Sequence, residues 1–155
     1  MQRGFTLIET VIVIAILGIA ATLAMPMIGN FLAAHELDYA ARNLAADIRY
    51  LQQLSINDPD NKADYKMFIQ NNEYRITWYN ATNPLNPMPE DTFKRVVLPA
   101  SVSIVSPPQQ LKFGSTGAPL KGTSILLQST KGGYKYVVVA SITGRVRVSD
   151  TADTE

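Results

Sequence analysis

The amino-acid sequence predicts an α+β fold in which one long N-terminal helix lies on an antiparallel β-sheet domain. Three observations carry this prediction. The chain opens with an apolar run that has no ionisable side chain between Glu9 and His35, and an amphipathic helical pattern follows. The remainder alternates short β-rich segments with turn residues. One long helix followed by a run of strands is the order expected of an α+β domain.

The first predicted element is an apolar helix over residues 5–28. Thr10 to Ile28 contains no charged side chain, and a helix of ~20 apolar residues is long enough to cross a bilayer. A helix also satisfies its own backbone hydrogen bonds in lipid. We therefore expect residues 5–28 to span a membrane or to form the core of an assembly.

Glu9 stands at the head of this apolar segment. An ionised side chain at the bilayer centre costs roughly 2.5–3.5 kcal/mol on insertion scales. Near the end of the helix, Glu9 is either an ordinary interfacial acid or a charge that waits for a partner. A secretory signal peptide is the competing interpretation, with Arg3 as a weak basic region and a cleavage site at residues 21–24. The acid at its head and the apolar residues beyond residue 24 argue against it.

Residues 29–57 are predicted to form the amphipathic second half of the same helix. Apolar residues recur there at spacings of three and four and form one stripe, made of Leu37, Ala41, Leu44, Ile48 and Leu51. Asp38 and Arg42 are four residues apart and can pair on the outer face. Asn57-Asp58-Pro59-Asp60 ends the helix, which would be on the order of 75 Å long if it were unbroken.

Pro26 interrupts the backbone hydrogen bonding of the predicted helix, and Gly29-Asn30 follows it. A proline inside a helix removes one hydrogen bond of the ladder and bends the helix where the pattern resumes beyond it. We expect a kink at Pro26, between residues 24 and 30.

Residues 58–149 are predicted to form the β-domain, and residues 150–155 a polar tail. About seven short strands are expected: 65–70 and 74–79 as a hairpin, then 93–98, 102–105, 123–129, 134–141 and 145–149, with a weaker candidate at 110–113. In the last strand Val146 and Val148 alternate with Arg145 and Arg147, so one face is apolar and the other basic.

Charge is distributed unevenly along the chain, although the net charge is +1. From Thr92 to Ser149 there is no Asp or Glu, whereas the same span holds eight Lys and Arg residues. These residues are either scattered, solvated side chains on strands or a basic face for a polyanion. The chain has no cysteine, which excludes disulfides and thiolate chemistry.

The sequence predicts neither an enzyme nor a cofactor or metal site. A single histidine, His35, cannot form a metal cluster alone and is more consistent with an interfacial polar residue. Asp58, Asp60 and Asp64 lack the glycine and the terminal glutamate of a calcium-binding EF-hand loop, so calcium binding there is a weak alternative.

Residues Arg3-Gly4-Phe5-Thr6-Leu7-Ile8-Glu9 and the apolar run after them resemble the class III leader of type IV pilins and type II secretion pseudopilins. The resemblance implies that a prepilin peptidase removes residues 1–4 by cleavage between Gly4 and Phe5, and that Phe5 is then N-methylated. It also implies that Glu9 guides assembly by pairing with the Phe5 amine of a neighbouring subunit.

The same resemblance implies a location. The chain would cross the bacterial inner membrane once, with its C-terminal domain outside the cytoplasm, and would then join a cell-surface or periplasmic filament of other pilins or pseudopilins. Arg3 before the apolar segment fits the cytoplasmic side by the positive-inside rule.

Within this superfamily, the C-terminal half resembles the GspH/FimT domain of minor pilins and H-type pseudopilins. The matching segments are Phe113-Gly114-Ser115-Thr116-Gly117, residues 125–128 and 136–139, and Gly144-Arg145-Val146-Arg147. The last segment matches a GRxR pattern that is implicated in DNA binding by FimT-like minor pilins. Guanidinium groups grip phosphates well, so the resemblance makes Arg145 and Arg147, with Lys131 and Lys135, candidate contacts for double-stranded DNA.

Three functional interpretations remain open at this point. The first is a minor pilin of a type IV pilus-like filament that binds DNA for uptake. The second is a minor pseudopilin of the type II secretion system, whose partners are other pseudopilins and an exported protein. The third is a secreted β-rich domain behind a signal peptide, and it predicts a mature N-terminus well beyond Phe5. A simple hairpin glycine and a solvated arginine remain an alternative explanation of the GRxR segment.

Overall fold

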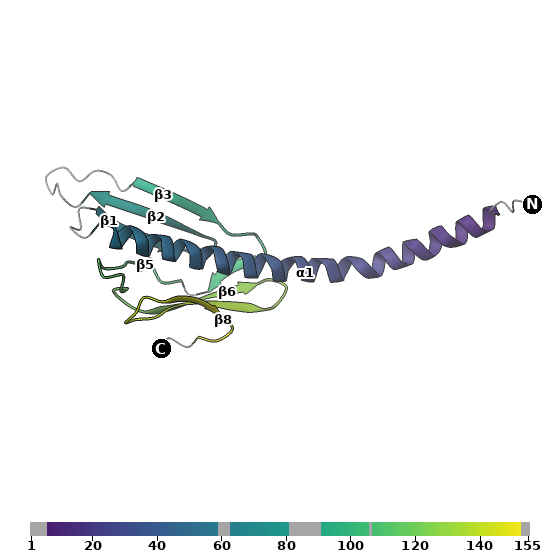
Figure 1. The fold of residues 1–155 in the computed structure, drawn as a ribbon. Coiled ribbons are helices and arrows are strands. Elements are labelled where there is room, and N and C mark those ends of the chain that lie inside the picture. Colours follow the sequence, from purple (N-terminus) through teal and green to yellow (C-terminus); the bar gives the residue numbers. More distant parts are fainter. Residues whose placement is uncertain (1–5, 59–62, 81–90, 106, 153–155) are drawn as a thin grey trace, which may run out of the picture. The chain divides into compact units, whose positions relative to one another are not determined.

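The computed structural model describes residues 6–58, 63–80, 91–105 and 107–152, with the backbone alone described at 23–27, 80 and 91. The chain divides into two compact units, Met1–Leu32 and Ala33–Glu155. The helix α1, Leu7–Ile56, contributes to both units (Figure 1). The long N-terminal helix that the sequence predicts over residues 5–57 is confirmed, and it is observed over Leu7–Ile56.

Thr6 begins α1 as its N-cap residue. Its Oγ1 accepts a hydrogen bond from the backbone N–H of Glu9 at 3.3 Å, which satisfies one of the N–H groups that have no partner within the helix. Glu9 lies in the first turn, where a carboxylate is favoured by the positive end of the helix dipole. The backbone of residues 24–30 is helical, and the side chain of Pro26 lies outside the described residues, so the kink remains a prediction.

In the described part of the chain, eight strands follow the helix, and they form two antiparallel sheets of four strands each. The first sheet has the order β3-β2-β1-β5 and the second the order β4-β6-β7-β8. Their bounds are Ala63–Ile69 (β1), Glu73–Asn80 (β2), Asp91–Val97 (β3), Val102–Val105 (β4), Gln110–Leu111 (β5), Thr123–Ser129 (β6), Tyr134–Val139 (β7) and Val146–Ser149 (β8). The predicted α+β arrangement of a long helix on antiparallel strands is therefore confirmed.

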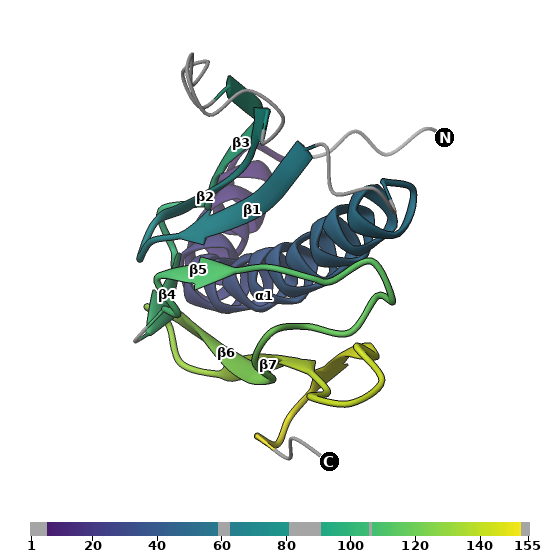
Figure 2. The same ribbon diagram turned by 90° about the vertical axis from the view of Figure 1, so that its left-hand side faces the viewer.

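The sequence predicts one sheet, and the structure has two because the chain changes partner between β3 and β4. Pro99 separates the two strands, and β4 then pairs with β6 instead of β3. In the unit Ala33–Glu155 the two sheets lie on either side of α1, and β4 and β5 lie where the sheets come together beside the helix (Figure 2). The backbone N–H of Ile104 on β4 bonds Asn71 O, in the β1–β2 turn, at 2.7 Å.

The predicted apolar stripe of the helix is the centre of the core. All five of its residues are buried, with exposed fractions of 4% or less. They contact buried side chains of both sheets, such as Met67 and Ile76 on one side and Ile125 and Val137 on the other. Because two sheets cover the helix, it also buries Ala40 and Ala45 beside the stripe.

A buried polar contact fixes the first sheet on the helix. Asp47 of α1 is 7% exposed, and its carboxylate accepts hydrogen bonds from the Tyr74 hydroxyl at 2.8 Å and from Lys94 Nζ at 2.6 Å. Burial, together with the bond to Asp47, raises the pKa of Tyr74. Both carboxylate oxygens therefore have partners, as a buried charge requires.

Candidate functional site

The first candidate site is the apolar part of α1 in the unit Met1–Leu32. Every described side chain of this unit is exposed, and large apolar side chains are among them: Leu7 is 84% exposed, Leu17 62% and Ile19 65%. Contiguous exposed apolar surface of this extent marks a site that another molecule or a membrane covers. No other described part of the unit Met1–Leu32 packs on these side chains.

Glu9 is the acidic residue of this apolar surface, and its side chain is exposed in the first turn of α1. Gly4 and Phe5 lie outside the described residues, so the cleavage between them and the pairing of Glu9 with a Phe5 amine stay predictions. Across the described side chains, which leave a gap at 23–27, no helix is both long enough and apolar enough to cross a membrane.

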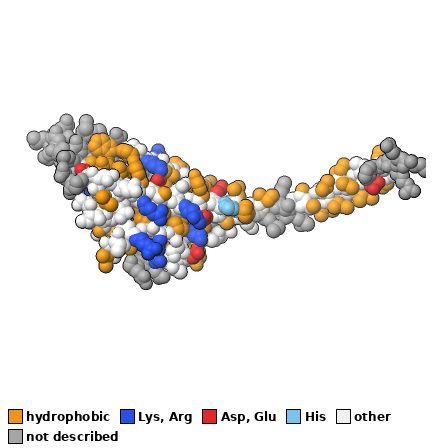
Figure 3. Space-filling model, viewed as in Figure 1, with side chains coloured by type: hydrophobic (Ala, Val, Ile, Leu, Met, Phe, Trp, Pro, Cys, Tyr) orange, Lys and Arg blue, Asp and Glu red, His pale blue; other side chains and the backbone are white. Residues whose placement is uncertain are grey.

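The second candidate site is an open groove of about 640 Å³ in the unit Ala33–Glu155, between α1 and the edge strand β8. We call it the α1–β8 groove. Its lining residues are Asp38, Arg42, Ala45, Arg49, Lys135 and all six residues from Arg145 to Asp150. Five of them are Lys or Arg and two are Asp. Figure 3 shows Lys and Arg side chains gathered on this face of the domain.

Two helix side chains hold the start of β8 against α1. Arg49 Nη2 donates a hydrogen bond to Val146 O at 2.9 Å, and Gln52 Nε2 donates to Gly117 O at 2.6 Å and to Gly144 O at 3.3 Å. Val146 is buried in the core, as the predicted alternation requires. Arg145 lies just before the strand and Arg147 within it, so both are carried by a segment whose backbone is fixed to the helix.

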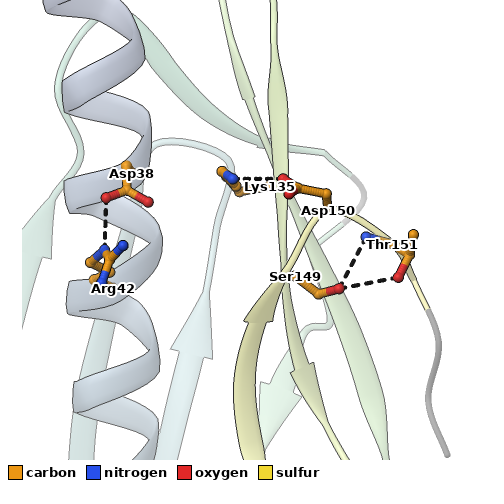
Figure 4. A network of polar contacts seen from close by, with 6 residues as sticks. All are labelled: Asp38, Arg42, Lys135, Ser149, Asp150 and Thr151. Atoms are coloured by element: carbon orange, nitrogen blue, oxygen red, sulfur yellow. Dashed lines mark hydrogen bonds and ion pairs between the residues drawn. The ribbon is translucent and has the colours of Figure 1, made fainter.

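Two ion pairs lie along the groove. Arg42 Nε bonds Asp38 Oδ2 at 2.7 Å, which confirms the predicted pairing at four residues, and Lys135 Nζ bonds Asp150 Oδ1 at 2.6 Å (Figure 4). The hydrogen bond that Arg42 donates to Asp38 raises the pKa of Arg42. The cations that line the groove are therefore partly neutralised by acids of the same chain.

The structure brings together three of the four basic residues that the sequence singles out. Lys135, Arg145 and Arg147 line the α1–β8 groove, whereas Lys131 lies in the turn between β6 and β7 and is not among the lining residues. Arg42 and Arg49 also line the groove and were not predicted as site residues. Their spacing of seven residues places them on one face of the helix, but the sequence does not show that this face lies beside β8.

The span from Thr92 to Ser149 has no acid of its own, but acids from other parts of the chain pair with several of its cations. Four of its eight basic residues pair with acids from outside the span, in the pairs Lys94–Asp47, Arg95–Glu73, Lys112–Asp64 and Lys135–Asp150. The two interpretations of the span therefore both apply in part. The ion pairs given above for the described residues involve four of the eight cations, and the groove contains three of the eight.

The aspartates of the weak calcium hypothesis have other roles in the structure. Asp58 accepts a hydrogen bond from the backbone N–H of Ala63 at 2.6 Å, and Asp64 pairs with Lys66 and Lys112. Asp60 lies outside the described residues. No group of three or more acidic or histidine side chains among the described residues could hold a metal ion.

Comparison with known proteins supports the resemblance seen in the sequence. A family model for the prokaryotic N-terminal methylation motif matches residues 1–25. The pilin-like protein PilA1 of Thermus thermophilus is 30% identical over 157 residues, which cover 95% of this chain and 98% of that protein.

Two solved structures share the fold. The type IV minor pilin FimU of Pseudomonas aeruginosa has a TM-score of 0.55 at 12% identity, over 76% of this chain and 97% of its own. The minor pseudopilin EpsH from the type 2 secretion system of Vibrio cholerae has a TM-score of 0.53 at 13% identity, over 74% and 96%. At these identities the likeness concerns the fold.

Proposed function

Because the chain belongs to the type IV pilin and pseudopilin superfamily, with a GspH/FimT-like fold, we propose that it is a minor pilin of a type IV pilus-like filament. The observation that carries the proposal is the uncovered apolar surface of α1 in the unit Met1–Leu32. In this function, residues 5–28 hold the chain in the bacterial inner membrane, and the helices of other pilins cover them after assembly. Such a subunit is structural and catalyses no reaction.

Glu9 gives the assembly its register in this proposal. A prepilin peptidase cleaves between Gly4 and Phe5, and the new Phe5 amine of a neighbouring subunit binds the Glu9 carboxylate. A charge buried without its partner is strongly destabilising, by about 3–5 kcal/mol. A subunit displaced along the filament axis would leave both charges unpaired, so the pair selects one axial position.

The mature N-terminus tests this proposal. We expect the intact mass of the chain, isolated from membranes and from sheared filaments, to correspond to a start at Phe5 with one methyl group. A signal peptide would instead give a chain that begins after residue 24 and is free in the medium. That result would remove the filament function.

A second proposed function is binding of double-stranded DNA at the α1–β8 groove, and the groove's excess of cations supports it. Arg145 and Arg147 line it, on a segment whose backbone Arg49 and Gln52 bind. Phosphate contacts by Lys and Arg provide affinity that is independent of sequence and sensitive to salt. Such a subunit would capture DNA for uptake.

A gel-shift assay at low salt with the full chain in a non-ionic detergent tests DNA binding. We expect the double variant Arg145→Gln/Arg147→Gln to lose at least about tenfold in affinity, because it loses two phosphate contacts. The salt dependence of binding should also become weaker, since fewer counterions are released. The matched control is Arg75→Gln/Lys121→Gln, which removes the same charge outside the groove. Equal losses in both variants would argue for an effect of net charge alone.

The type II secretion pseudopilin remains the alternative, and the fold likeness to EpsH supports it nearly as well as the likeness to FimU supports a pilus. In that function the partners are other pseudopilins and an exported protein. Deleting the coding gene separates the two. Loss of surface filaments with normal protein export favours the pilus, and retention of exported protein in the periplasm favours secretion.

A further inference from the structure

We infer that Asp38 and Asp150 compete with nucleic acid inside the α1–β8 groove, because they bind the cations that backbone phosphates would otherwise take. This inference rests on the proposed DNA-binding function. It adds to that function the side of the groove formed by α1, which we call the helix wall, and two acids that compete with the DNA phosphates. It concerns groups that the GRxR pattern does not include: Arg42 and Arg49 on α1, Lys135 on β7, and the two acids.

The contact of Lys135 with Asp150 lies at the C-terminal end of β8. Lys135 Nζ is 2.6 Å from Asp150 Oδ1, and the side chains are 30% and 76% exposed. Asp150 is held in a turn, since Ser149 Oγ accepts a hydrogen bond from the backbone N–H of Thr151 at 3.1 Å (Figure 4). The Asp150 side chain itself is open to solvent, so a ligand can displace it from Lys135.

The second contact lies on the helix wall. Arg42 is 73% exposed and its partner Asp38 is 39% exposed, so this pair is also accessible to a ligand. Arg49 is two turns further along α1, and it bonds the neutral Val146 carbonyl. Among the described residues Arg49 has no carboxylate partner, so no acid has to be displaced before it binds a phosphate. The helix wall therefore offers two charged arginines, of which only Arg42 is bound to an acid.

The strengths of these interactions allow displacement. Exposed ion pairs contribute little, equivalent to about two- to fivefold in an equilibrium constant. A phosphate that binds Lys135 or Arg42 must separate the existing pair, and the released carboxylate then attracts a cation from solution. The bound acid thus lowers the affinity for DNA and also the number of ions that binding releases to the solution.

Fluorescence anisotropy with a labelled double-stranded oligonucleotide tests the inference, with the full chain in a non-ionic detergent over a series of KCl concentrations. We expect Asp38→Asn and Asp150→Asn each to tighten binding about two- to fivefold. We also expect each to steepen the slope of log K against log salt by up to about 0.9, the value for one additional phosphate contact. Arg42→Gln should weaken binding and make the slope shallower.

The matched control is Glu73→Gln. Glu73 is ion-paired with Arg95 on the first sheet, so its replacement frees an arginine and changes the net charge equally, outside the groove. If Glu73→Gln tightens binding as much as the two Asp variants, net charge explains the effect and the inference is wrong. Arg75→Gln serves in the same way for Arg42→Gln.

The failures of the inference and of the proposed function are distinguishable. If wild type binds DNA and Arg145→Gln/Arg147→Gln abolishes binding, but the Asp variants change neither affinity nor slope, the inference falls and DNA binding stands. If neither wild type nor Asp38→Asn/Asp150→Asn binds at low salt, both fall. The inference is supported if the slope steepens in the two Asp variants and not in Glu73→Gln.

Discussion

Gly144 shows how a single residue of the GRxR segment acts on the fold. Its φ is +65°, in the region that favours glycine. A Cβ atom there would lie 2.2 Å from Gly117 O and 2.6 Å from Gln52 Nε2. The sequence relates this glycine to a DNA-binding pattern, and the structure gives it a packing role. Because Gly144 has no side chain, the backbone at Gly117 and the side chain of Gln52 can approach it closely, next to Arg145.

We predict that Gly144→Ala destabilises the protein by about 3 kcal/mol or more, because the backbone strain adds to a clash with a backbone oxygen. The control is Gly132→Ala, at φ +96° with no atom within 4 Å of the added Cβ, where strain alone should cost about 1 kcal/mol. Urea unfolding monitored by Trp78 fluorescence measures both. Equal losses would contradict the packing role of Gly144.

At the scale of the elements, local patterns predict the helix and most of the strands. The stripe from Leu37 to Leu51 has the helical period, and the β1–β2 hairpin has clear turn residues. Both could therefore be predicted, and the structure confirms both. The division into two sheets depends on β4 choosing β6 as its partner. That choice is a long-range contact between segments about twenty residues apart, and no local pattern records it.

The groove could be predicted only in part, for the same reason. Arg145 and Arg147 belong to a recognisable segment, whereas Arg42 and Arg49 have the ordinary look of a solvated helix face. Both line the groove, and Arg49 bonds the Val146 carbonyl, 97 positions away in the chain. Only the tertiary structure brings these arginines beside β8.

An ion pair joins β1 to the residue that follows the short strand β5 at the edge of the first sheet. It contributes two residues, which pair with Met67 and Phe68 of β1. Lys112 follows it directly and binds Asp64 on β1, and Lys66 binds the same carboxylate at 3.0 Å. Burial alone would raise the pKa of Asp64, but the hydrogen bonds from Lys112 and Lys66 outweigh it and hold the pKa below its usual value.

We therefore predict that Asp64 makes stability depend on acid pH. Its folded-state pKa lies below the unfolded value of about 3.9, so the unfolded state binds more protons between the two values and stability rises with pH there. The free-energy difference between wild type and Asp64→Asn in urea unfolding should be constant from about pH 7 to 5. It should shrink as the pH falls below about 4. A difference that stays constant down to pH 3 would contradict this account.

At the scale of the whole molecule, the chain combines a domain with a complete core and a helical segment that the unit Met1–Leu32 leaves uncovered. The sequence predicts this contrast, because a run without ionisable side chains and a period of 3.6 are both local features. The sequence does not show whether the filament belongs to a type IV pilus or to a type II secretion system. The fold does not show it either, since a pilin and a pseudopilin match it almost equally. That choice depends on partner subunits.

The central claim is that Glu9 is neutralised by another subunit when the apolar helix enters a filament. The most direct measurement compares Glu9→Gln with wild type in cells that assemble the filament, by immunoblots of the membrane fraction and of sheared filaments. The account predicts unchanged membrane levels and a loss of about tenfold or more from the filaments, as expected when a buried charge pair is broken. Glu73→Gln, in the β-domain, should behave as wild type. Normal incorporation of Glu9→Gln would contradict the claim.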